Sequence, residues 1–322
     1  MRRRELLARL GGAAAAWSLA TRARAQDRIA RIGYLSPLSP KPDADEFRAG
    51  LRDLGYVEGK NLEIVERIDD GHADRLPRLA AELVDQKVDV IVSFANGVYA
   101  AARVTKTVPI VMVTAADVVA MGLVASLAHP GGNITGQTFL VPELVAKRLA
   151  FLKQAAPSMI RAGVLLTRDS ASNPNMLAVL GVAAGALKVE LRPIEVADSG
   201  GLESAISAAV DEKIGGLVST DQTLFIRNAD AIAAIAQKRR LPSIGGPLYA
   251  RDGGLMGYGV NFPPMFRHAA VFVDKILRGE KPGDIPIEQA TKFETIVNLK
   301  SAEALGIAMP PVLLASADEV IE

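Results

Sequence analysis

Residues 88–92 are Val-Asp-Val-Ile-Val, a short β-branched run that lies between two segments with helical periodicity, 75–86 and 98–104. A second apolar run, 109–113, follows the later of these segments. Strands that are apolar almost throughout are typical of parallel sheets, because helices cover both faces of such a sheet. This stretch therefore predicts βαβ units and an α/β fold.

The same alternation of strand and helix patterns continues along the chain after residue 30. After Pro142 it begins again, so that a second βαβ set follows the first. The two sets share an order of elements but no close sequence repeat. The predicted strands are 31–36, 62–67, 88–92, 109–113, 134–137, 163–166, 190–195, 215–219, 242–244, 255–260 and 293–298, and the predicted helices are 43–54, 75–86, 98–104, 143–155, 174–187, 202–212, 224–239 and 265–278.

The first 25 residues have the pattern of an export signal. Arg3 and Arg4 precede an apolar, Ala-rich run at 10–20, and Ala23-Arg24-Ala25 supplies a small-residue cleavage site. The apolar run is shorter than the ~20 residues that a membrane-spanning helix needs. We predict a signal peptide cleaved after Ala25 and a mature protein that works in the periplasm. The paired arginines favour the twin-arginine route, and ordinary Sec export is the alternative.

The 297 residues after this leader exceed what one hydrophobic core usually organises, so we expect two lobes. Lobe 1 is expected to comprise 27–138 and 262–284, and lobe 2 to comprise 139–261 and 285–322. Open α/β sheets bind ligands at the carboxyl ends of their strands. The sequence therefore predicts a binding cleft between the strand-end loops of the two lobes.

The charge balance excludes one class of partner. The chain has 37 basic and 36 acidic residues, and the leader holds six of the arginines and one glutamate. The mature part therefore has 31 basic and 35 acidic residues, a net charge of −4. Without a basic surplus or a Lys/Arg run it lacks the electrostatic footprint of a protein that binds nucleic acid or an anionic membrane. No later stretch is long and apolar enough to predict a membrane span.

Catalysis has little support in the sequence. Cysteine is absent, which excludes both disulfides and a thiol nucleophile. The three histidines, His72, His129 and His268, are widely separated and have no metal-ligand or triad spacing. The glycine-rich segment 253–259 borders a strand and opens no helix, so it predicts a turn and not a phosphate loop. We expect no catalytic residue, no metal and no cofactor.

Several phrases, taken in their order along the chain, are typical of one family. The phrases are Ile32-Gly33-Tyr34-Leu35-Ser36, Gly55-Tyr56-Val57-Glu58-Gly59-Lys60-Asn61, Gly122-Leu123-Val124-Ala125-Ser126-Leu127, Pro130-Gly131-Gly132-Asn133-Ile134-Thr135-Gly136, Val273-Asp274-Lys275-Ile276-Leu277-Arg278-Gly279 and Thr291-Lys292-Phe293-Glu294. Together they resemble the ABC-transporter substrate-binding proteins of the tryptophan or aromatic-amino-acid type. The resemblance implies a type I periplasmic binding fold, in which two Rossmann-like lobes with parallel sheets flanked by helices are joined by a multi-crossing hinge. It also implies that the lobes close around a small solute and deliver it to an ABC permease in the inner membrane.

Two turns depart from the family pattern where solute is expected to bind. The family commonly has a Gly-Thr-Pro-like turn after the third strand, where this chain has Phe94-Ala95-Asn96-Gly97. An Asp-Pro pair after the fourth strand is Asp117-Val118 here. We expect Phe94, Ala95 and Asn96 to contact the ligand, with Phe94 as an aromatic wall and Asn96 as an amide that donates and accepts. The resemblance does not transfer an amino-acid specificity.

Small hydroxyl residues precede several of the predicted helices. Ser36 and Ser39 precede the first helix, Thr114 precedes Asp117, and Ser170 precedes the helix at 174–187. The free N–H groups and the positive dipole end of a helix can hold a carboxylate at such positions. We therefore include these four hydroxyl residues and Asp117 in the predicted site, and an N-cap or turn role is the alternative for each.

Two charged side chains are candidates in the second lobe. Asp221 follows a strand that ends near Ser219, where a carboxylate can bind a ligand amine or hydroxyl or cap a helix. Arg168 lies at the mouth of the lobe and is the candidate partner for an acidic solute. A solvated surface arginine is the alternative.

Two tyrosines and two amides complete the candidate site. Tyr249 and Tyr258 lie beside glycine-containing turns, where they can stack on a planar ligand or pack the hinge. Gln137 and Asn261 fall near the predicted lobe crossings. They either bind ligand or hydrogen-bond the linker backbone.

The sequence thus predicts an exported receptor, a monomer, that captures a small organic solute without chemistry of its own. The expected solute is an aromatic or planar carboxylate or amino acid, and the expected partner is an ABC permease. The alternative is a receptor that engages a membrane sensor kinase.

Overall fold

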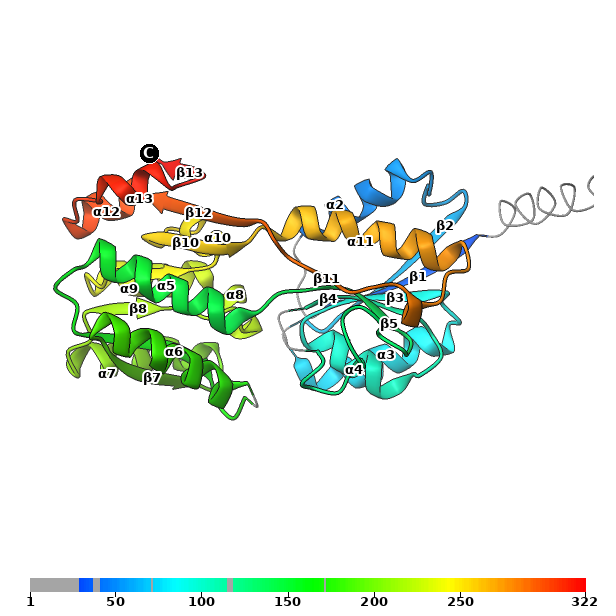
Figure 1. Ribbon diagram of the computed structural model, residues 1–322, viewed down its shortest axis with the longest axis horizontal. Coiled ribbons are helices and arrows are strands. Elements are labelled where there is room, and N and C mark those ends of the chain that lie inside the picture. Colours follow the sequence, from blue (N-terminus) through cyan, green and yellow to red (C-terminus); the bar gives the residue numbers. More distant parts are fainter. Residues whose placement is uncertain (1–28, 37–40, 71, 115–117, 171) are drawn as a thin grey trace, which may run out of the picture. The chain divides into compact units, whose positions relative to one another are not determined.

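Two compact units make up the part of the chain that the computed structural model describes, which is residues 29–36, 41–70, 72–114, 118–170 and 172–322 (Figure 1). The first unit consists of the described residues up to Val113, Met121–Gln137 and Pro263–Ile287. The second consists of Thr114 and the described residues up to Ala120, Thr138–Phe262 and Glu288–Glu322. The predicted leader, 1–25, lies outside the described residues.

The first sheet is six-stranded, with the order β11-β5-β4-β3-β1-β2. β1 pairs in parallel with both β2 and β3, and β3 pairs in parallel with β4. All residues of β3 and β4 are buried, as expected for strands covered on both faces. The strands are β1 (Ala30–Ser36), β2 (Leu62–Ile68), β3 (Val90–Phe94), β4 (Ile110–Thr114), β5 (Ile134–Thr138) and β11 (Glu288–Gln289).

Helices cover both faces of this sheet. α3 (Leu76–Asp85) packs beside α4 (Asn96–Val104) on one face, and α2 (Lys41–Asp53) and α11 (Phe262–Leu277) lie on the other (Figure 1). Close approach of α2 and α11 depends on Gly50, since a Cβ there would lie 2.3 Å from the carbonyl oxygen of Arg267. Short 3-10 turns, η1 (Ala73–Arg75) and η3 (Pro282–Asp284), complete this region.

The second sheet is seven-stranded, with the order β13-β12-β10-β9-β8-β6-β7. Its pairings are parallel except that of β10 with β12, which is antiparallel. The strands are β6 (Arg161–Thr167), β7 (Glu190–Val196), β8 (Gly216–Val218), β9 (Ser243–Gly245), β10 (Met256–Val260), β12 (Phe293–Asn298) and β13 (Glu319–Ile321). This arrangement confirms the predicted α/β class with mostly parallel sheets.

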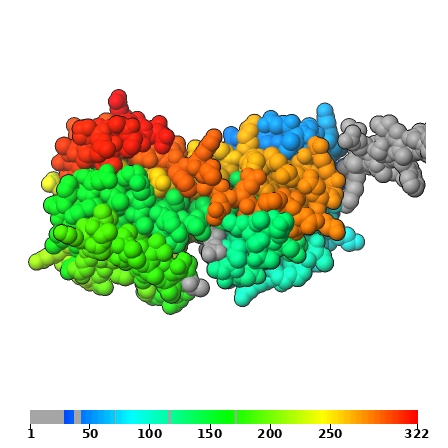
Figure 2. Space-filling view, viewed as in Figure 1, coloured from blue at the N-terminus to red at the C-terminus, as the bar shows by residue number. Residues whose placement is uncertain are grey.

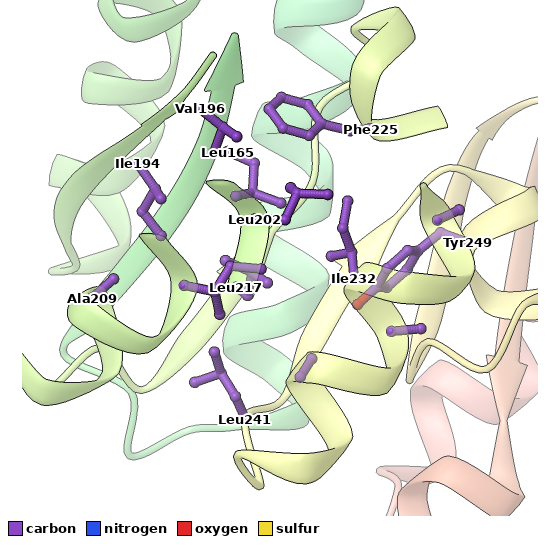
Figure 3. Packing of buried hydrophobic residues seen from close by; sticks show 14 of the residues in the cluster. Leu165, Ile194, Val196, Leu202, Ala209, Leu217, Phe225, Ile232, Leu241 and Tyr249 are labelled. Carbon is purple, nitrogen blue, oxygen red and sulfur yellow. The ribbon is translucent and has the colours of Figure 1, made fainter. Parts of the chain in front are cut away.

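A hydrophobic core fills one side of the second sheet. Side chains of β6, β7 and β8 meet those of α7, α8, α9 and α10 there, and Figure 3 shows Phe225, Ile232 and Leu217 among them. The C-terminal residues, red in Figure 2, lie against α5, which is green. The helices of this unit are α5 (Val141–Ala155), α6 (Asn173–Leu187), η2 (Ser199–Gly201), α7 (Leu202–Asp211), α8 (Thr223–Arg227), α9 (Ala229–Lys238), α10 (Pro247–Arg251), α12 (Leu299–Leu305) and α13 (Pro311–Ala315).

Two local predictions are wrong. The helix expected at 224–239 is two helices, because Asn228 leaves the helical conformation with φ −117° and ψ 29°. Its side-chain Nδ2 donates to the carbonyl oxygen of Leu224 at 2.7 Å, which satisfies a carbonyl at the end of α8. The glycine-containing turn expected beside Tyr249 leads directly into α10, which Gly246 and Pro247 initiate and which contains Tyr249 itself.

The core on the α9 side yields a stability prediction. Phe225 is almost completely buried in it, so Phe225→Ala should lower the free energy of unfolding by about 3–5 kcal/mol. The control is Val182→Ala in α6, whose side chain is 78% exposed and whose loss should cost less than about 0.5 kcal/mol. Urea unfolding followed by circular dichroism measures both values. Equal effects would contradict the assignment of Phe225 to the core.

Candidate functional site

Each sheet has one point where the chain reverses the direction in which it adds strands. In the first sheet β1 lies between β2 and β3, and in the second β6 lies between β7 and β8. Loops leave the carboxyl ends of the two central strands in opposite directions at such a point, which opens a crevice for ligand. The carboxyl ends of β1 and β3, and those of β6 and β8, are therefore the candidate binding edges.

The crevice between β1 and β3 is partly filled by the chain itself. Ser93 Oγ donates to the carbonyl oxygen of Leu35 at 2.8 Å, which bonds the two strands through a side chain. A Cβ on Gly97 would lie 2.5 Å from that hydroxyl oxygen, so α4 needs glycine there to begin this close to the sheet. Ser36, the last residue of β1, is buried beside this crevice.

The turn from β3 into α4 contains an unusual backbone conformation. Ala95 has φ 47° and ψ −126°, a region that non-glycine residues rarely adopt. Such conformations cost about 1–3 kcal/mol and concentrate at binding and catalytic sites. Asn96 follows as the first residue of α4 and is exposed, so the turn presents an amide side chain and the helix N-terminus at the candidate edge.

Three other predicted residues of this region are buried. Phe94 packs against Phe266 with ring centroids 5.7 Å apart. Thr114 ends β4, and its carbonyl oxygen accepts from the amide of Phe139. Gln137 Nε2 donates to the carbonyl oxygen of Met265 at 2.8 Å, which joins β5 to α11. The side chain of Phe94 thus packs within the fold and that of Gln137 bonds the backbone, whereas the contact given for Thr114 is made by its backbone.

Amide side chains bridge the crevice between β6 and β8. Gln222 Oε1 accepts from the amide of Thr167 at 2.6 Å, and Gln222 Nε2 donates to Asn173 Oδ1 at 3.1 Å. Asn173 Nδ2 donates in turn to the carbonyl oxygen of Thr167 at 2.9 Å. This network fixes the end of β6 to the loop after β8, and no feature of the sequence pattern singled out Gln222 or Asn173.

A buried ion pair lies at the end of β8. Arg148 of α5 is fully buried, and its Nη2 lies 2.8 Å from both carboxylate oxygens of Asp221. Arg148 Nη1 donates to the carbonyl oxygen of Ser219 at 3.0 Å and Nε to that of Tyr258 at 2.6 Å. Asp221, predicted as a candidate ligand-binding carboxylate, is therefore paired within its own unit, and its side chain is 7% exposed.

Sequence reasoning missed Arg148, although a signal was present. In the predicted helix 143–155, position 148 falls on the same face as Leu144, Val145 and Leu152, which are buried. A charged residue on the apolar face of an amphipathic helix indicates a buried partner.

The remaining predicted residues of the second unit differ in exposure. Arg168 is exposed after β6, and Ser170 Oγ lies 3.0 Å from Ser172 Oγ. Tyr258 in β10 is partly buried, with its ring edge-on to Phe151 at 5.2 Å, and burial raises the pKa of its hydroxyl. Asn261, just after β10, is partly exposed.

Tyr249 belongs to the core and not to a turn that faces solvent. It lies in α10, is 3% exposed, and its hydroxyl is 2.8 Å from Ser243 Oγ (Figure 3). Burial raises the pKa of its hydroxyl far above the usual range. The phenol is thus neutral and already hydrogen-bonded.

Two predicted residues, Ser39 and Asp117, lie outside the described residues. Among the residues that the structure does describe, no group of three or more acidic or histidine side chains is arranged to hold a metal ion. None of the helices within that part has the length and hydrophobicity to cross a membrane.

A family described as ABC transporter substrate binding protein matches residues 40–321, which is most of the chain. The chain belongs to this family. Substrate-binding proteins of this family act outside the cytoplasm, bind a small solute, work with an ABC permease and are not enzymes.

Comparison with individual proteins supports membership of this family. The chain is similar to a tyrosine-binding protein of Clostridioides difficile, with 26% identity over 279 residues that cover 85% of this chain and 80% of the relative. A conserved domain protein from Vibrio cholerae superimposes with a TM-score of 0.84 at 25% identity, covering 91% of this chain and 100% of that one. A domain from Streptococcus pneumonia solved in complex with L-Trp has a TM-score of 0.83 at 21% identity, covering 91% and 99%. These folds confirm the type I periplasmic binding architecture.

The turn at Ala95 gives a prediction that separates backbone strain from side-chain packing. Ala95→Gly should leave stability unchanged or raise it, because glycine adopts positive φ without a Cβ clash. Ala95→Val should lower the free energy of unfolding by about 1–3 kcal/mol, because a β-branched residue fits this region worst. Ala186→Val on the exposed face of α6 is the control and should cost under about 1 kcal/mol. Thermal unfolding measures the order, and equal stability of the Gly and Val variants at position 95 would exclude strain there.

Proposed function

We propose that this substrate-binding protein captures an aromatic amino acid for an ABC importer, by closure of its two units on the solute. The observation that carries the proposal is the similarity to a tyrosine-binding protein over most of both chains. Family membership supports the transport role, and the strand-end chemistry of each unit supports an amino acid as the solute.

An amino acid has two charged groups, and each unit offers a partner for one of them. The start of α4 follows the strained Ala95, and the first amides of a helix have no acceptor within the helix. These amides, with Asn96 beside them, suit a carboxylate. In the second unit, one guanidinium nitrogen bonds both oxygens of Asp221, so the carboxylate retains lone pairs that can accept from an ammonium group.

The proposed site also includes residues that can contact the solute's ring and its polar edge. Tyr258 supplies a partly buried aromatic ring near the end of β10, and Asn261 follows it by three residues. Ser36, Thr114, Arg168 and Ser170 lie at or just after other strand ends. Phe94, Gln137 and Tyr249 support the site from within the core, since their side chains are buried.

Calorimetric titration of residues 26–322 tests the solute class. L-Tyrosine and L-tryptophan should bind and should raise the melting temperature, because a ligand of the folded state alone stabilises it. L-Leucine, benzoate and glucose serve as controls and should bind at least about tenfold more weakly, since each lacks either the ring or one charged group. Preference for leucine or glucose would contradict the proposal.

A mutant cycle tests the role of Asp221. Asp221→Asn should weaken L-tyrosine about 10- to 100-fold, because a charge-assisted hydrogen bond to the ammonium is lost. The same variant should bind 3-(4-hydroxyphenyl)propionate, which has no ammonium group, as weakly as wild type does. Asp211→Asn, at the exposed end of α7, is the control. An equal loss for both compounds would show that Asp221 does not contact the ammonium.

We also propose that residues 1–25 are a signal peptide for the twin-arginine route. Mass spectrometry of the exported protein should find Gln26 at the N-terminus. Replacing Arg3 and Arg4 together by lysine should block export if the twin-arginine route is used, and should leave it intact if Sec is used.

A further inference from the structure

We propose that Arg148 is the positioning residue of the second unit's part of the solute site. Its guanidinium fixes the backbone at the end of β8 and at Tyr258 in β10, together with the Asp221 carboxylate, as one rigid surface for the solute. The inference rests on the proposed function for the identity of the solute, and it adds a residue that does not itself need to touch the solute.

The bonds of Arg148 join segments that are far apart in the sequence. Ser219 and Asp221 lie 71 and 73 residues away along the chain, and Tyr258 lies 110 residues away. A planar guanidinium donates in fixed directions, so these four bonds set the relative positions of the acceptors. The partners belong to the loop after β8, which is one of the candidate binding edges, and to Tyr258 in the middle of β10.

Two glycines make room for this arrangement. A Cβ on Gly259 would lie 2.8 Å from Arg148 Nη2, and one on Gly246 would lie 3.1 Å from Asp221 Oδ1 and 3.4 Å from Arg148 Nη2. Gly246 precedes α10 at the end of β9. The guanidinium therefore packs closely against the ends of three neighbouring strands, β8, β9 and β10.

The ion pair is a costly way to obtain stability alone. Both charges leave water, and replacing such a pair by apolar residues of similar size is often neutral or stabilising. By contrast, a rigid guanidinium that holds two carbonyl groups and a carboxylate restricts their motion directly. Preorganisation of this kind lowers the entropic cost of binding a ligand.

The test compares three variants of residues 26–322. Arg148→Met with Asp221→Leu removes both charges, so that neither is left buried and alone. Arg148→Lys keeps the positive charge on a single nitrogen that cannot reproduce the separate bonds of Nε, Nη1 and Nη2. Lys238→Met with Glu203→Leu removes an exposed ion pair between α9 and α7 and is the matched control.

The readouts are melting temperature, amide hydrogen exchange and the Kd for L-tyrosine and L-tryptophan. For the Arg148→Met/Asp221→Leu variant we expect a melting temperature within about 5 °C of wild type and exchange about tenfold faster, confined to 219–222, 246–250 and 258–261. The Kd of this double variant should rise at least about tenfold, a loss that includes the Asp221 contact with the ammonium group. Arg148→Lys keeps Asp221, so its Kd, which should also rise at least about tenfold together with the same faster exchange, is the binding test of Arg148 itself. The control pair should change none of the three.

Each other result has a definite meaning. Unchanged exchange in the three segments overturns the proposal whether or not any solute binds. Faster exchange with an unchanged Kd overturns it too, because the rigid surface would then not matter for binding. If wild type binds neither amino acid, the proposed function fails, and the exchange data alone decide whether Arg148 fixes the strand ends. If the double variant does not fold, Arg148→Lys decides the same question.

Discussion

Burial of parallel strands on both faces is the constraint on which the rest of the structure depends. Strands such as β3 and β4 have no exposed face, so every residue must be tolerated in an apolar environment and every backbone group must pair within the sheet. Helices must therefore alternate with strands along the chain, and each parallel connection must return over the sheet. The loops that leave the carboxyl ends of the strands do not have to cover the sheet. Most of the candidate binding residues lie in or next to these loops.

Three polar side chains that enter this apolar framework, Ser93, Gln222 and Arg148, have hydrogen-bond partners at or near strand ends. Ser93 bonds the carbonyl of Leu35 between β1 and β3, and Gln222 bonds the end of β6. Arg148 is the extreme case, a fully buried cation with a carboxylate and two carbonyl groups around it. Because a buried donor without an acceptor is expensive, each of these side chains fixes the backbone that it contacts. The candidate binding edges are thus held in place by polar side chains.

Whether the sequence predicted an element correctly depended on how far apart in the chain the interacting residues lie. Periodicity and β-branched composition located β3, β4 and α3 to within two residues, because both signals are local. The same signals failed at Asn228, whose side chain interrupts a helix pattern, and at α10, which is only five residues long. These signals also could not predict that β12 runs antiparallel to β10, since a helix separates the two strands in the sequence.

For the site, the sequence by itself determined which segments end at the carboxyl edges of the sheets. Its family phrases also determined the kind of protein to which this chain belongs. Tertiary structure alone decided what the side chains there do. Tyr249 followed a glycine pair and suited a ligand wall, yet its ring fills the core and its hydroxyl bonds Ser243. Arg148 was one charge in a helix pattern, and it becomes the partner of Asp221 only when α5 packs on the sheet. Local patterns encode where strands and helices begin and end, whereas the pairing of a buried charge depends on contacts between residues 71 to 110 positions apart.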